Sequence, residues 1–408
     1  MDSREQRGLE MAATVKLQRK GSVWMVPSQA DRGVSYTVDL KWEEPTCSCP
    51  DHEARRLKCK HIHAVEFSIR RETRPDGTTT VTKTVRVTYK QDWPAYNAAQ
   101  THEKARVSEL LHGLCEGIKQ PPQGRGRPRL PLADVVFSAA MKVYSTVSGR
   151  RATSDLRECA AKGLVAHAPH YNSIFHYLEN PDLTPILKAL VEESASPLKA
   201  VESDFAVDSS GFASCVFIRW YDEKYGKVRS QPDWVKAHLM IGVKTNIVTS
   251  VEVTGRDAHD CPYLPPLLET TAKKFQVSEL SADKGYISSK NLQAVVNAGA
   301  VPYIPFKSNT TGQGPELWRK MFHFYQFNRS EFLASYHKRS NVESTFSMIK
   351  AKFGASVRSK THVAQVNEVL CKVLCHNLCV LVQSIYELGI APTFWAETPV
   401  AQERRLDA

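Results

Sequence analysis

Apolar and polar residues alternate with a strand-like period early in the chain, and helical spacing replaces this pattern before residue 118. The predicted elements are strands at 22–26, 35–40 and 81–89 and helices at 63–70 and 94–118. Residues 120–131 are rich in Pro, Gly and Arg and interrupt the pattern, so we place a domain boundary there. The first predicted domain covers residues 1–118.

Short helical segments follow this boundary. Residues 133–147, 155–163 and 171–180 carry apolar residues at helical spacing, and polar segments such as 148–154 separate them as predicted turns. Short helices joined by tight turns are typical of helix-turn-helix modules. We therefore predict a basic linker and a helical DNA-binding segment over residues 119–198.

Strand and helix patterns alternate from about Val201 onward, and only residues 308–330 show no clear period. The predicted elements are strands at 204–208, 237–243, 247–253, 277–283 and 301–306 and helices at 260–274, 288–299, 335–354 and 362–388. This order indicates an α/β fold with a mixed sheet. We assign residues 199–360 to this domain and residues 361–408 to a C-terminal helix packed on it.

Composition and charge restrict the function classes. The chain has 408 residues, 42% of them hydrophobic, which excludes a largely disordered chain. A formal net charge of +11 favours an anionic partner, with nucleic acid first. Because no run of 18 apolar residues and no apolar signal core occur, we expect no membrane span and a cytoplasmic, nucleoid-associated protein. The ten cysteines would then serve metal binding or core packing.

One cysteine cluster has the spacing of a metal site. Its members are Cys47, Cys49, Cys59 and His61. Three thiolates and one imidazole suit tetrahedral Zn²⁺ with no open position, which is a structural site. His52 and His63 are alternative donors for the fourth position. Two strands, C-x-C, a spacer and C-x-H at the start of a helix resemble the SWIM zinc finger.

Three further cysteines, Cys371, Cys375 and Cys379, recur every four residues. They share one apolar face of the predicted helix at 362–388, and no His/Cys partner set accompanies them. We therefore expect core packing and no metal there.

Two aspartates end predicted strands. Asp208 ends the predicted strand 204–208 and precedes Ser209-Ser210-Gly211, which we read as a turn. Asp283 ends the predicted strand 277–283. Sheets of α/β domains place their sites at the carboxyl ends of strands, although a cap or turn role is equally open for either aspartate alone. Asp260 begins the predicted helix 260–274, and we expect it to be its N-cap, with a secondary contribution to a metal site left open.

The predicted helix 335–354 contributes a third carboxylate. Tyr336, Arg339, Glu343 and Lys350 fall on one face, beside an apolar stripe. Two strand-end aspartates and one helix glutamate can hold a pair of Mg²⁺ or Mn²⁺ ions, which suits phosphodiester cleavage.

These motifs resemble insertion-sequence DDE transposases. The resemblance rests on Asp208 with Ser-Ser-Gly, on Ser-Ala-Asp-Lys-Gly-Tyr around Asp283, and on the Y-2-R-3-E-6-K spacing from Tyr336 to Lys350. It implies an RNase H-like fold and a catalytic triad of Asp208, Asp283 and Glu343. It also implies that Arg339 and Lys350 contact or orient DNA near the cleaved bond and that Tyr336 supports the helix or touches DNA.

Basic residues before the α/β domain are candidates for DNA contacts. Arg125, Arg127 and Arg129 lie in an Arg-Gly-Arg-Pro-Arg segment that resembles an AT-hook core. A plain basic linker explains the segment as well. Arg150 and Arg151 are candidates for phosphate or base contacts.

The sequence thus predicts a DNA transposase that uses Zn²⁺ and Mg²⁺ or Mn²⁺ and binds transposon ends and target DNA, as a homodimer in the DNA complex. One alternative is a DDE nuclease that cuts without joining. Another is a zinc-finger DNA-binding regulator, against which the complete Asp, Asp and Glu set argues.

Overall fold

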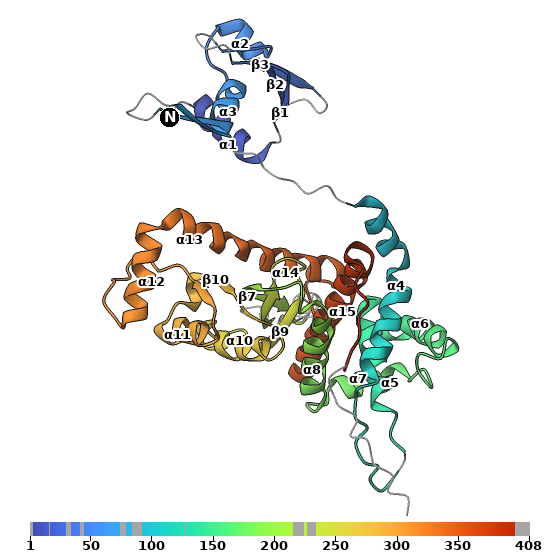
Figure 1. Cartoon of the computed structure of the whole chain (residues 1–408). Coiled ribbons are helices and arrows are strands. Elements are labelled where there is room, and N and C mark those ends of the chain that lie inside the picture. The colour runs from blue at the N-terminus through green and yellow to red at the C-terminus, as the bar shows by residue number, and fades with distance from the viewer. Residues whose placement is uncertain are drawn as a thin grey trace, which may run out of the picture. The chain divides into compact units, whose positions relative to one another are not determined.

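The computed structural model describes residues 3–15, 17–29, 34–40, 45–73, 79–83, 92–126, 128–214, 224–226 and 234–395. The chain divides into an N-terminal unit, Met1–Gln91, and a C-terminal unit, Asp92–Ala408 (Figure 1). The C-terminal part of the predicted strand 81–89 lies outside the described residues.

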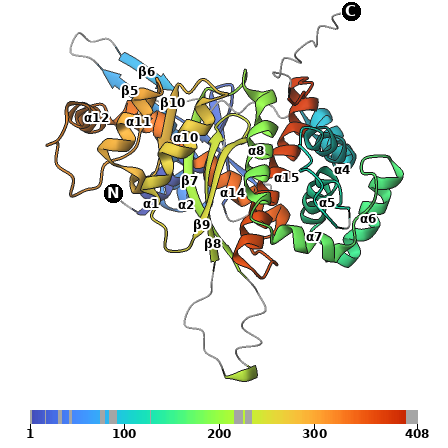
Figure 2. The same cartoon turned by 90° about the horizontal axis from the view of Figure 1, so that it is seen from below.

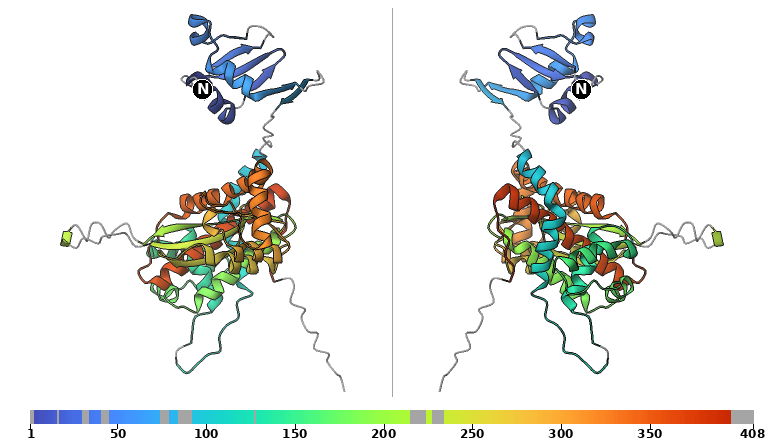
Figure 3. Two further views of the ribbon diagram at one scale, coloured as in Figure 1. Left: turned by 90° about the vertical axis from the view of Figure 1, so that its left-hand side faces the viewer. Right: turned by 90° about the vertical axis from the view of Figure 1, so that its right-hand side faces the viewer.

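A four-stranded antiparallel sheet forms the centre of the N-terminal unit. Its strands lie in the order β1 (Gln18–Lys20), β2 (Val23–Pro27), β3 (Ser35–Asp39) and β4 (Thr46–Cys47). The helices are α1 (Ser3–Thr14), α2 (Pro50–Arg55) and α3 (Lys60–Ser68), and β5 (Ile69–Thr73) pairs with β6 (Thr79–Lys83). Helix α3 contacts α1 and β3. Figure 3 shows the helices and the sheet of this unit in blue from two sides. Every second residue of β2 is buried, as the strand period predicts. Its buried residues Trp24 and Val26 pack in one cluster with Val38 of β3.

The C-terminal unit begins with helices that precede its sheet. They are α4 (Trp93–Cys115), α5 (Leu132–Tyr144), α6 (Gly149–Ala161), α7 (Tyr171–Leu178) and α8 (Leu183–Ala195). The predicted turn at 148–154 is wrong, because α6 begins at Gly149. Ser148 is its N-cap and accepts a hydrogen bond from the Arg151 amide at 3.5 Å. The polar residues that suggested a turn are mostly solvent-facing residues of this helix.

The five-stranded sheet confirms the predicted mixed α/β fold. Its order is β11 (Val301–Tyr303), β10 (Glu279–Ala282), β7 (Asp204–Ala213), β8 (Trp234–Gly242) and β9 (Val248–Gly255). Strands β7, β8 and β9 pair antiparallel, whereas β10 and β11 run parallel to β7. An antiparallel meander extended on its first strand by two parallel strands is the RNase H-like arrangement.

Helices cover both faces of this sheet (Figure 2). Phe205 and Val207 of β7 pack in one cluster with residues of α10 (Leu264–Ala272) and α11 (Ser289–Asn297). Ala206 and Phe212 point the other way and pack with α14 (Ser340–Phe353) and α15 (His362–Leu388). Asp208 has the same parity as Ala206, so its side chain lies on the α14 side.

The end of the unit differs from its prediction in two places. The helix predicted at 335–354 is divided into α13 (Arg329–Tyr336), a 3-10 turn at His337–Arg339 and α14. Helix α12 (Glu316–Phe327) lies within residues 308–330, where no period was recognised. Its exposed face carries Glu316, Arg319, Lys320 and His323, and on its other side Phe322 and Tyr325 pack against the buried Phe306 and Phe332.

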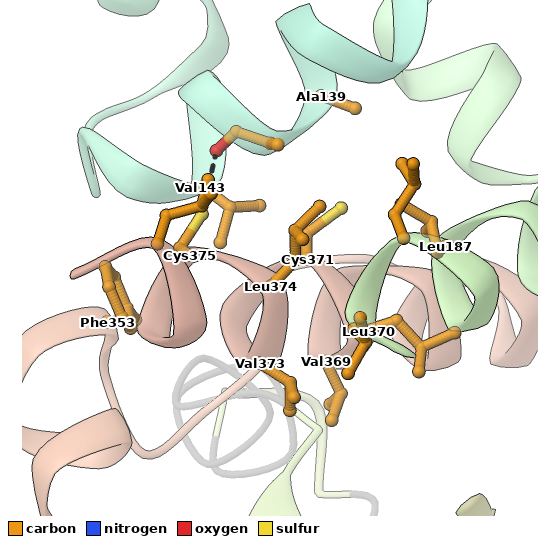
Figure 4. Packing of buried hydrophobic residues seen from close by; sticks show 14 of the residues in the cluster. Ala139, Val143, Leu187, Phe353, Val369, Leu370, Cys371, Val373, Leu374 and Cys375 are labelled. Carbon is orange, nitrogen blue, oxygen red and sulfur yellow. Dashed lines mark hydrogen bonds between the residues drawn. The ribbon is translucent and has the colours of Figure 1, made fainter. Parts of the chain in front are cut away.

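Helix α15 is the central helix of the larger core. Among the described helices it alone is long and apolar enough to cross a membrane, but 72% of its most apolar window is buried inside the protein. Cys371 and Cys375 are fully buried beside Leu370 and Leu374, and Cys375 Sγ lies 3.3 Å from the Ala140 carbonyl (Figure 4). The predicted core packing is confirmed for Cys371 and Cys375, and Cys379 is partly buried against the same cluster.

Candidate zinc site and candidate active site

Four buried side chains converge in the N-terminal unit. They are Cys47, Cys49, Cys59 and His61. Their ligand atoms all lie within 4.8 Å of one another, and His61 Nδ1 is 3.8 Å from the sulfur atoms of both Cys47 and Cys59. A tetrahedral zinc ion with bonds of about 2.3 Å to sulfur spaces its ligand atoms at nearly the 3.8 Å that separates His61 Nδ1 from these two sulfur atoms. The donor set and its spacing therefore fit a closed structural zinc site.

The alternative histidine donors are engaged elsewhere. His52 Nδ1 lies 2.8 Å from the Leu57 carbonyl oxygen, and His63 Nδ1 lies 3.4 Å from Glu66. The fourth ligand is thus His61. Hydrogen bonding from Cys47 lowers the pKa of Cys59 to about 3, so the cluster already favours a thiolate at that position.

Two aspartates of the candidate active site lie side by side on neighbouring strands. The parallel ladder between β7 and β10 ends at the pair Val207 and Ala282, so Asp208 and Asp283 both follow its last pair. The predicted turn after Asp208 is wrong, because β7 continues to Ala213 and pairs with β8, with Ser209 opposite His238. Asp208 therefore lies inside β7 and only Asp283 follows the end of its strand, but the register still places the two residues next to each other where the parallel ladder stops.

Glu343 lies in the first turn of α14, and Arg339 connects it to Asp208. The Arg339 guanidinium is 2.6 Å from Asp208 Oδ2 and forms an ion pair with Glu343. Its side chain is only 17% exposed. Arg339 and Tyr336 precede α14 because the helix is broken at residues 337–339, yet the ion pair still brings Arg339 and Glu343 together.

Burial raises the pKa of Asp208, and the nearby charges of Asp283 and Glu343 contribute to this increase. The Ser209 amide, which donates to Asp208 Oδ1 at 2.8 Å, and Arg339 oppose it. Arg339 joins Asp208 to Glu343, whose side chain is 56% exposed. Among the described residues, only the Cys₃His cluster brings three or more ligand atoms close enough for one metal ion. The three carboxylates are the ligand type that Mg²⁺ or Mn²⁺ prefers, and they would have to move closer together to hold such an ion.

Lys350 and Tyr336 are fixed beside this centre. Lys350 Nζ donates to Ser210 Oγ at 2.6 Å, two residues after Asp208, and lies 5.3 Å from the centre of the Phe212 ring. Burial lowers the pKa of Lys350. The Arg339 guanidinium lies 5.9 Å from the centre of the Tyr336 ring, so Tyr336 supports the bridging arginine.

Asp260 lies at the predicted N-cap position, directly before the 3-10 turn Cys261–Tyr263 that leads into α10, but its side chain makes no cap hydrogen bond. Its carboxylate instead accepts from Ser209 Oγ and pairs with Lys236. Sequence reasoning missed this role, because nothing in the residues around Asp260 indicates that β7 and β8 lie beside it.

The candidate DNA-binding arginines lie away from the carboxylates. Arg125 and Arg129 are exposed on the linker between α4 and α5, and Arg127 lies outside the described residues. Arg150 and Arg151 are exposed in the first turn of α6, and Arg150 Nε lies 3.4 Å from Tyr171 Oη.

Two family models match the chain, one in each unit. Residues 199–378 match the transposase DDE domain, and residues 36–69 match the SWIM zinc finger. No curated protein matches the chain. The fold and the site therefore define a catalytic domain of the DDE class, whose members bind DNA and use divalent metal ions. The chain carries a DDE transposase domain, which implies DNA transposition, behind an N-terminal SWIM zinc finger with a Cys₃His zinc site.

Proposed function

We propose that this chain is an insertion-sequence transposase of the Y-R-E-K type, which cuts the ends of a DNA element and joins them to target DNA. The observation that carries this proposal is the position of Asp208 and Asp283 after the last pair of the parallel ladder, with Glu343 linked to Asp208 through Arg339. The Tyr336, Arg339, Glu343 and Lys350 spacing supports the Y-R-E-K assignment.

The three carboxylates would hold Mg²⁺ or Mn²⁺, which activates the attacking oxygen and stabilises the leaving oxygen of an in-line displacement. Asp208 is oriented by the Ser209 amide, so its second oxygen faces the centre of the site. Arg339 can transfer one of its contacts to a phosphate oxygen when metal ions neutralise the carboxylates. Lys350, held by Ser210, places a second positive charge near the scissile phosphate.

We further propose that the protein acts as a homodimer on the DNA and works in the cytoplasm, in association with the nucleoid. Two ends of one element must be cut and joined together, which suits a pair of identical catalytic domains. The net charge of +11 supports association with chromosomal DNA.

A strand-transfer assay tests the proposed function. Labelled DNA carrying the inverted repeats that flank the gene is incubated with the full chain, Mg²⁺ and a supercoiled target plasmid. Joined products support the transposase. Cut ends without joined products would favour a DDE nuclease, and DNA binding without cleavage would favour the regulator.

A further inference from the structure

A cavity of about 450 Å³ lies where α5, α6 and α7 meet the segment between α14 and α15. Three cationic side chains line it, namely Lys142, Arg358 and Lys360. Glu179 is the acidic member of the lining, and it is exposed and 4.0 Å from His176. The cavity is therefore electropositive.

Lys142 is a charged side chain in an unusual environment. It is 6% exposed and makes no side-chain hydrogen bond or ion pair with any described residue. Its ammonium lies 5.8 Å from the centre of the Phe175 ring, which also lines the cavity. Although most of this side chain is buried, its ammonium is not fully enclosed, so it can reach a negatively charged ligand in the cavity.

The start of α6 forms another wall of the same cavity. Ser148 and Gly149 line it, and the first turn of this 13-residue helix leaves amide groups without intrahelical acceptors. A Cβ atom at Gly149 would lie 2.5 Å from the Phe175 ring. Glycine at this position therefore allows the ring to close against the helix terminus.

Hydrogen bonds to Glu368 of α15 fix the segment that carries Arg358 and Lys360. The buried Glu368 carboxylate accepts from the amides of Arg358 at 3.0 Å and Ser359 at 2.8 Å, and from Ser359 Oγ at 2.6 Å. Both cationic side chains remain exposed at the rim of the cavity. A site with fixed walls loses little entropy when it binds a ligand.

We infer that this cavity binds a phosphate of the DNA backbone, with Lys142 and the α6 amides as its floor and Arg358 and Lys360 as its rim. The exposed Arg150 and Arg151 continue the positive surface from the same helix turn, which favours a polymer of phosphates over a free ion. The inference rests on the proposed function only in taking DNA as the substrate.

The test measures how the full chain binds a labelled DNA duplex at several salt concentrations, using fluorescence anisotropy. Lys142→Met should bind about tenfold more weakly and reduce the slope of log K against log salt by about 0.9, since one phosphate contact is lost. Lys360→Gln, an exposed change that spares the core, should also reduce the slope. Lys290→Met, an exposed lysine of α11, is the matched control and should match the wild type.

The inference is overturned if both Lys142→Met and Lys360→Gln show the same slope of log K against log salt as the wild type. If Lys142→Met fails to fold, an unchanged slope in Lys360→Gln alone overturns it. A second arm measures thermal stabilisation by inorganic phosphate. If Lys142→Met loses this stabilisation but keeps the DNA slope, the cavity binds free phosphate and the DNA assignment is wrong. The proposed function fails separately, when the wild type binds DNA with its full slope but yields neither cut nor joined products.

Discussion

Asp260 accepts a hydrogen bond from Ser209 Oγ at 2.8 Å, although the two residues are 51 positions apart in the chain. Ser209 also donates its amide to Asp208, so one serine orients two carboxylates. Lys236 lies 2.5 Å from Asp260, and His238, whose pKa burial lowers to about 4, lies 3.5 Å from it. Asp260 therefore fixes the backbone that carries Asp208.

Replacing Asp260 should weaken metal binding at the neighbouring site. In Asp260→Ala, Ser209 loses its acceptor and Asp208 its orientation, so the Mn²⁺ midpoint for cleavage and for calorimetric Mn²⁺ binding should each rise about tenfold or more. Asp257→Ala, whose side chain is 90% exposed, is the control and should leave both midpoints unchanged. An unchanged Mn²⁺ affinity in Asp260→Ala would show that the residue only stabilises the fold.

The candidate triad makes a stricter prediction. Asp208→Asn, Asp283→Asn or Glu343→Gln should each abolish cleavage in Mg²⁺ while DNA binding stays nearly intact, because each change removes one anionic ligand and no basic contact. Labelled-end cleavage and anisotropy measure the two properties. Glu331→Gln, an exposed acid on α13, should remain active. Full cleavage by any triad variant would remove that residue from the triad.

How far the sequence predicted this site depends on how local each relationship is. The zinc ligands lie within one short segment, so their spacing identified them. Asp208 and Asp283 were recognised because strand patterns end near them. The predicted strand was too short at Asp208, because pairing of β7 with β8 overrides the turn tendency of Ser209-Ser210-Gly211. The contacts of Asp260 depend on strand register, which no local pattern records.

Lys350 should contribute one contact to DNA. Removing it in Lys350→Ala should weaken the complex with transposon-end DNA and reduce the log–log salt slope by about 1. The matched control is Lys307→Ala, an exposed lysine beyond β11. A wild-type slope in Lys350→Ala would leave the residue a structural one, holding Ser210 and packing on Phe212.

Acid should destabilise the C-terminal unit through His376. This residue is buried on α15, Nε2 lies 2.9 Å from the Asn246 carbonyl oxygen, and burial lowers its pKa to about 4. Because the unfolded chain has a pKa near 6.5, it binds more protons than the folded chain between these values, and stability falls as the pH falls through this window. The full effect is on the order of 3 kcal/mol. The thermal midpoint of His376→Gln should depend less on pH from 6.5 to 4 than that of the wild type, whereas the exposed His167→Gln should behave like the wild type.

The zinc site should serve folding of the N-terminal unit and take no part in cleavage. All four positions are filled by Cys47, Cys49, Cys59 and His61, so no water is left to activate. Structural zinc in small modules contributes on the order of 10 kcal/mol, and this unit has only a small core. Cys47→Ser should therefore lose its zinc ion and become protease-sensitive within residues 1–91, while the C-terminal unit keeps its own cores and its metal-dependent nicking.

The control for this change is His63→Ala, which removes an alternative donor that the structure pairs with Glu66. Elemental analysis should find one zinc ion in the wild type and in His63→Ala, and none in Cys47→Ser. A chain that begins at Asp92 should still nick DNA but bind transposon ends more weakly, because the finger is expected to contribute affinity or site choice. A wild-type protein without zinc, or a Cys47→Ser protein with unchanged protease resistance over residues 1–91, would contradict the structural role, since a closed tetrahedral site cannot lose one thiolate without losing the fold it holds.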